Sequence, residues 1–234
     1  MMLGAGLLAV AACDSAKPDA AEAKGKAAAT RDWTTMIVAT PEGGVRMGNP
    51  DAKVKLVEYA SFTCTHCRDF HLEASAKLKD GLVKAGRVSY EYRPFMLNGV
   101  DIVVAQIAKC QPANQFFVWA DQLYRNHDAW VLPFTRIDPA TIARVQALPQ
   151  AQQLSAYAAA GQFDAWAKVR GVTKAKFDQC LADQGAFQRL QAAAQAGQEQ
   201  FNISATPTFI INGTRADGVF NWATLEPKIM EALK

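Results

Sequence analysis

The pattern of hydrophobic and polar positions predicts a mixed α/β fold. Residues 54–60 are mostly apolar, as in a strand at the centre of a sheet. Residues 87–93 alternate between apolar and polar side chains, which indicates a second strand. Between them, about 64–85 repeats apolar side chains every four residues and ends at Gly86, so we expect a helix. This succession predicts a parallel pair of strands joined by a right-handed crossover.

Further elements are expected on both sides of this unit. Residues 33–39 and 45–47 are typical β segments around a turn. Towards the other end, about 185–201 predicts a long helix. Residues 206–215 then predict a strand, a tight Asn-Gly turn and the start of a returning strand. Apolar residues at every fourth position predict a final helix over about 222–234.

Between residues 99 and 184 the pattern is helical throughout. Proline and glycine divide this block into expected helices near 101–110, 113–126, 139–147, 150–160, 162–170 and 174–183. Large aromatic side chains are expected to fill its core rather than line a peptide groove. They are Trp119, Trp130, Phe134, Tyr157, Phe163 and Trp166.

Without the helical block, the order of elements is β, β, α, β, α, β, β, α. This order predicts an α/β fold in which a thioredoxin-like mixed sheet is flanked by helices. We expect its first half over 33–98, an inserted all-helical subdomain over 99–184, and its second half over 185–234.

The start of the chain resembles an export signal. An apolar run ends in Val10-Ala11-Ala12-Cys13, which is similar to a bacterial lipobox, so we expect a signal peptide over 1–13 and a lipid on Cys13. Ordinary cleavage after Ala11, or a short buried apolar stretch, are the alternatives. Residues 14–32 lack large apolar side chains, which predicts a flexible tether or a short solvated helix.

Composition limits the classes of function. The 234 residues are 50% hydrophobic and 20% charged, as in ordinary soluble globular proteins. A net charge of +3 is too small to favour nucleic acid or an acidic membrane surface as a partner. The sequence has no apolar run long enough for a transmembrane helix, so membrane contact is expected only through the lipid. Setting Cys13 aside leaves four cysteines, a number that can pair completely.

The motif Cys64-Thr65-His66-Cys67 falls at the turn between the expected strand and helix. Unpaired N–H groups at a helix N-terminus and the helix dipole favour a thiolate there. The spacing suits dithiol–disulfide chemistry, but half of a zinc site or a structural disulfide would share it. His71 could share a helix face with both cysteines, yet a fourth ligand is missing. We expect no metal and no cofactor; a metal carrier is the alternative of a different class.

Cys110 and Cys180 fall in the first and last helices of the expected insertion. We expect them to form a structural disulfide, which would stabilise the fold by about 4 kcal/mol at most by constraining the unfolded chain. A second redox pair is the alternative, although neither cysteine belongs to a C-x-x-C motif.

Glu58, the Cys64–Cys67 motif and Ala205-Thr206-Pro207-Thr208-Phe209 together resemble the DsbA-like thiol–disulfide oxidoreductases that carry an inserted helical domain. The similarity in layout extends over about 33–234. It implies that Cys64 is the nucleophile and that Cys67 resolves mixed disulfides with client proteins.

The resemblance also implies roles for the residues around the two cysteines. His66 would lie beside the Cys64 thiolate and lower the pKa of that thiol. Glu58 would be a buried proton relay for Cys67, with a pKa raised by desolvation. A cis Pro207 would turn backbone groups of Thr206 towards an extended client chain.

Two departures from the family leave the direction of the reaction open. Thr65 stands where strongly oxidising members usually carry proline, and Thr206 is a residue type also found in isomerases and reductases. We expect a monomeric disulfide oxidase, because the dimeric isomerases carry a folded dimerisation domain in place of the tether. An isomerase, a reductase and a non-catalytic helical binding protein are the alternatives.

The expected oxidase would act outside the cytoplasm, in the periplasm, on reduced exported polypeptides. A membrane quinone-linked protein resembling DsbB or the VKOR-type proteins would reoxidise it. Both partners are implied by the resemblance alone.

Overall fold

The computed structural model describes residues 31–234. The expected signal peptide over 1–13, the lipid site Cys13 and most of the expected tether lie outside the described residues. The last two tether residues are described, and both contact the folded part. The Arg31 guanidinium lies 4.4 Å from the centre of the Trp33 ring, and the Asp32 side chain accepts a hydrogen bond from the Thr34 N–H. The part of the chain that the structure describes thus begins two residues before the end of the expected tether, and the boundary at residue 32 stays a prediction.

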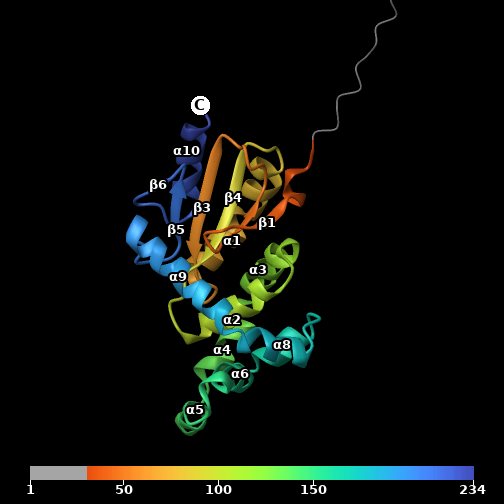
Figure 1. Cartoon of the computed structure of the whole chain (residues 1–234). Helices are drawn as coiled ribbons and strands as arrows, with labels where there is room; N and C mark the ends of the chain where they lie inside the picture. Colours follow the sequence, from red (N-terminus) through yellow and green to blue (C-terminus); the bar gives the residue numbers. More distant parts are fainter. Residues whose placement is uncertain (1–30) are drawn as a thin grey trace, which may run out of the picture. The chain divides into compact units, whose positions relative to one another are not determined.

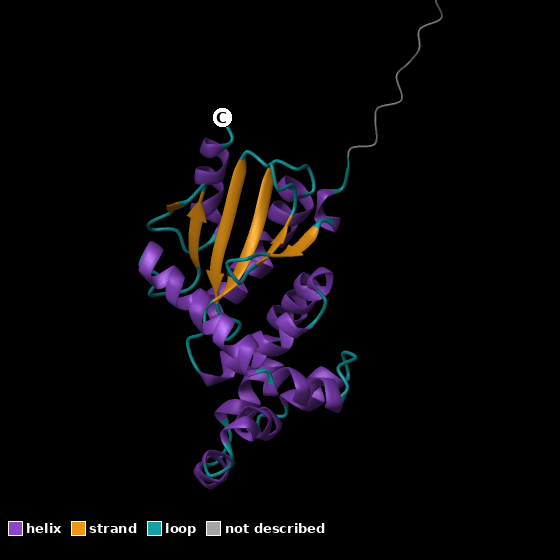
Figure 2. Ribbon diagram, in the orientation of Figure 1, coloured by secondary structure: helices purple, strands orange, loops and turns teal. Residues whose placement is uncertain are grey.

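The structure contains the expected mixed sheet, with strands in the order β1-β2-β4-β3-β5-β6 (Figures 1 and 2). The central strand β3 pairs in parallel with β4, with Val54 opposite Val88, and antiparallel with β5. All the other pairings are antiparallel. The strands are β1 (Ile37–Ala39), β2 (Val45–Met47), β3 (Val54–Ala60), β4 (Val88–Pro94), β5 (Thr208–Ile211) and β6 (Thr214–Arg215).

Helices cover both faces of the sheet because successive side chains of β3 point to opposite sides. Leu56 and Ala60 join the main core together with residues of α1 (Thr65–Ser75), which continues as a π-helical segment, η2 (Ala76–Val83). α10 (Trp222–Ala232) packs beside α1. On the other face, Tyr59 meets α9 (Gln184–Phe201), where a Cβ on Gly197 would lie 2.4 Å from the Tyr59 ring. Only glycine permits this close approach.

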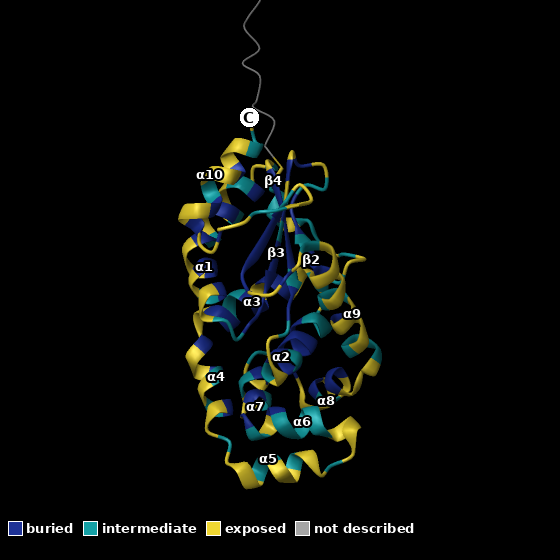
Figure 3. Cartoon of the chain, turned by 90° about the vertical axis from the view of Figure 1, so that its left-hand side faces the viewer, coloured by how far each residue is buried: buried dark blue, intermediate teal, exposed yellow. Residues whose placement is uncertain are grey.

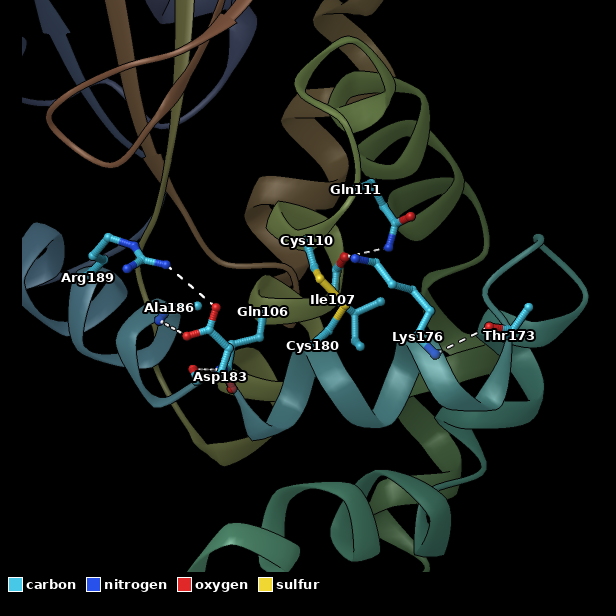
Figure 4. The surroundings of a disulfide bond; sticks show 10 residues. All are labelled: Gln106, Ile107, Cys110, Gln111, Thr173, Lys176, Cys180, Asp183, Ala186 and Arg189. Carbon is cyan, nitrogen blue, oxygen red and sulfur yellow. Dashed lines mark hydrogen bonds and ion pairs between the residues drawn. A yellow bond between two sulfur atoms is a disulfide. The ribbon is translucent and has the colours of Figure 1, made fainter.

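The block between β4 and α9 is helical, as expected, and is held by an aromatic core and one disulfide. Trp130 and Phe163 are fully buried there, and the Cys110–Cys180 disulfide joins α2 to α8 with its Cα atoms 5.9 Å apart (Figure 4). Of the aromatic residues expected in this core, Tyr157 and Trp166 are only partly buried. The elements are α2 (Gly99–Cys110), η3 (Ala113–Gln115), α3 (Phe116–Arg125), α4 (His127–Thr135), α5 (Pro139–Gln146), α6 (Gln150–Ala160), α7 (Phe163–Lys168) and α8 (Lys174–Ala182).

Two local expectations were wrong. Residues Trp33–Thr35 form a 3-10 turn, η1, instead of the start of a strand. The segment from His127 forms α4, a helix that the sequence pattern did not predict because Pro133 indicated a break. Packing overrides that signal, because Trp130 and Phe134 are buried and place one face of α4 against the core. Figure 3 shows buried segments along these helices. Among the described residues, no helix has both the length and the apolarity to cross a membrane.

Candidate active site

Cys64 lies at the junction between strand β3 and helix α1. The strand ends at Ala60, the turn Ser61–Thr63 follows, and Cys64 is the N-cap residue of α1 with extended backbone angles. Its thiol donates to the Thr206 carbonyl oxygen at 3.3 Å. Cys64 is half-buried, whereas Cys67, one turn further into the helix, has no exposed surface. A reagent can therefore reach the first sulfur more easily than the second.

The surroundings of Cys64 stabilise its thiolate. They lower its pKa from 9.0 to about 5, chiefly through a hydrogen bond from the Cys67 thiol, against the opposing effect of burial. The Thr206 hydroxyl and the backbone N–H groups of Cys67 and His66 lower the pKa further. Thr206 Oγ1 is buried and has no hydrogen-bond partner among the described residues, so its hydroxyl is free to turn to the thiolate. The donors at the start of α1 thus act together on one sulfur.

Cys67 and Glu58 are held in the opposite, protonated state. Burial raises the pKa of Cys67 well above its usual value, and the Cys64 and Glu58 charges add to the rise. Glu58 lies on the α1 side of β3 and is 2% exposed. Burial raises the pKa of Glu58 to about 8, although a hydrogen bond from the Tyr90 hydroxyl opposes the rise. A neutral carboxylic acid near a buried thiol can supply or accept a proton at neutral pH.

Buried tyrosines connect this acid side of the site to the helical insertion. Tyr92 and Tyr124 share a hydrogen bond of 2.8 Å between their hydroxyls, and the Tyr124 hydroxyl donates to the Ser61 carbonyl at 3.1 Å. Sequence reasoning missed these residues, as it missed Asp101, which hydrogen-bonds to Ser61 and Thr63. The available signal was a single acidic residue inside an otherwise apolar helix start, Val100-Asp101-Ile102-Val103.

The segment before β5 forms the other wall of the site. The Thr206–Pro207 peptide bond is cis. A groove of about 610 Å³ begins here, and its lining includes His66, Phe70, Thr206, Pro207 and Phe220. Thr206 links this groove to the redox site, because it lines the groove and its carbonyl oxygen lies 3.3 Å from the Cys64 sulfur.

The two histidines of α1 lie in different surroundings. His66 is exposed, and its imidazole makes no hydrogen bond to any residue in the described range; its backbone N–H is what acts on Cys64. His71 is buried, with Nε2 3.4 Å from an Asp121 carboxylate oxygen and its ring beside that of Tyr124. Within residues 31–234, no three His, Cys, Asp or Glu side chains are grouped as metal ligands.

The fold and the site define a thioredoxin-type dithiol protein. The family model described as Thioredoxin matches residues 40–231. A protein-disulfide isomerase from Novosphingobium aromaticivorans has a crystal structure with a TM-score of 0.77 and 33% identity, covering 82% of this chain and 98% of that one. The chain therefore belongs to the thioredoxin family, and its architecture is that of the DsbA-like branch.

Two further proteins are similar to this chain. The crystal structure of α-DsbA1 from Wolbachia pipientis has a TM-score of 0.62 at 20% identity, covering 80% of this chain and 89% of that one, and shares the fold. A Rickettsia bellii protein, named as a protein-disulfide oxidoreductase, is 24% identical over 177 residues. That match covers 75% of this chain and 60% of the relative, so the chain spans about three fifths of that protein's length.

Proposed function

We propose that this protein is a thiol–disulfide oxidoreductase that donates the Cys64–Cys67 disulfide to reduced client proteins. The observation that carries the proposal is the contrast between the two thiols. The pKa of Cys64 is lowered to about 5, whereas burial raises the pKa of Cys67. A stable Cys64 thiolate is a good leaving group and stabilises the reduced form, which makes the disulfide form an oxidant.

The exchange proceeds in two steps. A client thiolate attacks the Cys64 sulfur, so that a client–Cys64 disulfide forms, the Cys64–Cys67 bond breaks and Cys67 leaves as a thiolate. The second client thiolate then attacks the client sulfur of this mixed disulfide. A client disulfide forms and Cys64 leaves as a thiolate, so two electrons have passed from the client to the cysteine pair.

Proton transfer accompanies the first step. The buried Cys67 thiolate must be protonated, because the pKa of this thiol lies well above its usual value. Glu58, whose pKa is raised to about 8, is the neighbouring acid that can give up a proton and later recover one from solvent. Glu58 is thus the proton relay of the proposed mechanism.

The groove beside Thr206 and Pro207 is the proposed client site. Extended peptides bind by pairing with exposed backbone groups, and side chains then fill adjacent pockets. The Thr206 carbonyl oxygen lies 3.3 Å from the Cys64 sulfur, so a client backbone arriving there would lie against the reacting sulfur. Exposed Phe220 offers an apolar contact at the rim.

The setting of the reaction is proposed from the sequence. The lipobox-like end at Cys13 supports export and attachment to a membrane by lipid, with reduced exported polypeptides as clients. A membrane quinone-linked protein resembling DsbB or the VKOR-type proteins would remove the electrons. The protein would work as a monomer in the periplasm.

A disulfide isomerase is the second candidate. It is favoured by the relative from Novosphingobium aromaticivorans, which is called a protein-disulfide isomerase, and by Thr206 at the position before the cis proline. An isomerase uses the reduced cysteine pair to attack wrong client disulfides, so it must be kept reduced in the cell.

Equilibration of the purified protein with glutathione buffers separates the candidates. The proposal expects an equilibrium far more oxidising than that of thioredoxin, together with fast oxidation of a reduced, unfolded client. A potential as reducing as that of thioredoxin would overturn the oxidase and favour a reductase. Rapid reshuffling of a scrambled client by the reduced protein, with slow oxidation of a reduced one, would favour the isomerase.

A further inference from the structure

A buried carboxylate holds the turn that precedes Cys64. Asp101 lies in the first turn of α2 and is 1% exposed. Its Oδ1 accepts from the Thr63 N–H at 3.0 Å, and its Oδ2 accepts from the Thr63 hydroxyl at 2.9 Å. The Ser61 hydroxyl lies 2.9 Å from both oxygens. Oδ2 also accepts from the Leu97 N–H at 2.9 Å, so one side chain joins the turn to the start of the insertion.

The same turn contacts both thiol-bearing residues. The Ser61 carbonyl accepts from the Cys64 N–H at 3.4 Å. A backbone hydrogen bond from Ser61 acts on the Cys67 sulfur and lowers the pKa of that thiol against the larger effect of burial. A second hydrogen bond joins this turn to α2: the side-chain amide of Asn98, the N-cap residue of α2, donates to the Thr63 hydroxyl at 3.0 Å. A shift of this turn would therefore move the groups around both sulfurs.

The contacts call for a carboxylate at this position. The N–H groups of Thr63 and Leu97 are fixed donors that point at different oxygens of Asp101. A carboxylate accepts both, whereas an amide of the same shape has one acceptor oxygen and one NH₂ donor. An asparagine here would leave one buried N–H facing another donor, which costs free energy and displaces the backbone.

We propose that Asp101 is a positioning residue for disulfide exchange, which sets the stability of the Cys64 thiolate by clamping the turn 61–63 to the start of α2. The helical insertion thereby takes part in tuning the redox site. The inference rests on the proposed function for its catalytic meaning, but its test is made on the Cys64 thiol and needs no client.

The test measures the Cys64 thiol pKa, from the pH dependence of thiolate absorbance, and the equilibrium constant with glutathione. We expect Asp101→Asn to raise the pKa of Cys64 by about one unit. The glutathione equilibrium should move about tenfold towards the disulfide form, because a less stable thiolate disfavours the reduced protein. Ser61→Ala and Thr63→Val each remove one hydroxyl donor and should produce smaller shifts in the same direction. If Asp101→Asn does not fold, these two variants test the same effect on the Cys64 pKa.

Asp138→Ala is the matched control. Asp138 is the N-cap residue of α5 and accepts from the Thr141 N–H at 2.9 Å, within the same insertion. This variant should lower the unfolding midpoint and leave the Cys64 pKa unchanged. If Asp101→Asn does the same, Asp101 is merely structural and the inference is overturned. If the wild type fails to oxidise clients but Asp101→Asn still shifts the Cys64 pKa, the proposed function fails and the role of Asp101 stands.

Discussion

Cys64 and Cys67 lie one turn apart at the start of one helix, whereas Cys110 and Cys180 lie 70 residues apart and join two helices. The first pair is surrounded by groups that treat its two sulfurs unequally. One sulfur is half-buried and meets several donors, and the other is fully buried near Glu58. This asymmetry allows one cysteine to leave as a thiolate while the other takes up a proton.

The second pair is joined as a disulfide, with Cys110 partly buried and Cys180 buried. Figure 4 shows two hydrogen bonds near this disulfide that cap the ends of helices. Asp183 accepts from the Ala186 N–H at 2.8 Å, and the Gln111 amide donates to the Ile107 carbonyl at 3.0 Å. These contacts hold α2, α8 and α9 in place. The comparison teaches that a redox site is defined by what stabilises one thiolate and delivers a proton, since the cysteines themselves are the same.

The largest expected effect comes from removing Cys64, the sulfur that the client thiolate attacks. Cys64→Ser should abolish client oxidation, because no mixed disulfide can form, while the fold is retained. Measuring oxidation of a reduced client and the unfolding midpoint of the same sample checks both parts. Retention of client oxidation by this variant would mean that the Cys64–Cys67 pair is not the redox centre.

The double variant Cys110→Ser/Cys180→Ser should lower stability and leave client oxidation unchanged. We expect it to lower the free energy of unfolding by about 4 kcal/mol at most, because a closed loop of this length restricts the unfolded chain. Its Cys64 pKa and client oxidation, measured where the variant is folded, should match the wild type. A shifted Cys64 pKa would show that the second pair is coupled to the first and would break the comparison.

Glu58→Gln should change how stability depends on pH. In the reduced protein the pKa of Glu58 is raised from 4.5 to about 8, so its contribution to stability falls as pH rises through that window. The pKa of Cys64 is lowered from 9.0 to about 5, so its contribution rises between those values. The two slopes oppose each other in the wild type.

Of these two opposing slopes, only that of Cys64 remains in Glu58→Gln. The unfolding free energy of the reduced variant, measured by denaturant at several pH values, should therefore rise from about pH 5 to about pH 9 more steeply than that of the wild type. Cys64→Ser is the matched control, with a slope of the opposite sign. A pH profile identical to that of the wild type would contradict the placement of a protonated acid at residue 58.

The smallest expected effect comes from Thr206→Val, which keeps the shape of the side chain and removes its hydroxyl. The pKa of Cys64 should rise by less than about one unit, since the Cys67 thiol and the backbone N–H groups still act on the sulfur. Thiolate absorbance against pH measures the shift. Thr208→Val is a suitable control, because its hydroxyl donates to the Ala205 carbonyl and not to the sulfur. An equal shift in both variants would refute a specific role for the Thr206 hydroxyl.

The sequence determined the elements whose signals are local. The run 54–60 predicted β3 with its observed bounds, and the helix predicted over 150–160 is α6. Hydrophobic periodicity and the positions of proline and glycine depend only on neighbouring residues, so they predict an element whatever packs against it. The C-x-x-C spacing at a strand–helix turn likewise indicated the candidate site, because three residues of helix place the second cysteine one turn inside the first.

Only the tertiary structure decided which groups act on the two sulfurs. The Tyr90–Glu58, Ser61–Asp101 and Cys64–Thr206 contacts join residues 32, 40 and 142 positions apart. Packing also made His127 the buried first residue of helix α4 and left His66 in solvent. No periodicity encodes such pairs, since they depend on how strands and helices stack. The thiolate environment of Cys64 is therefore a product of the fold, assembled around a motif that the sequence alone could locate.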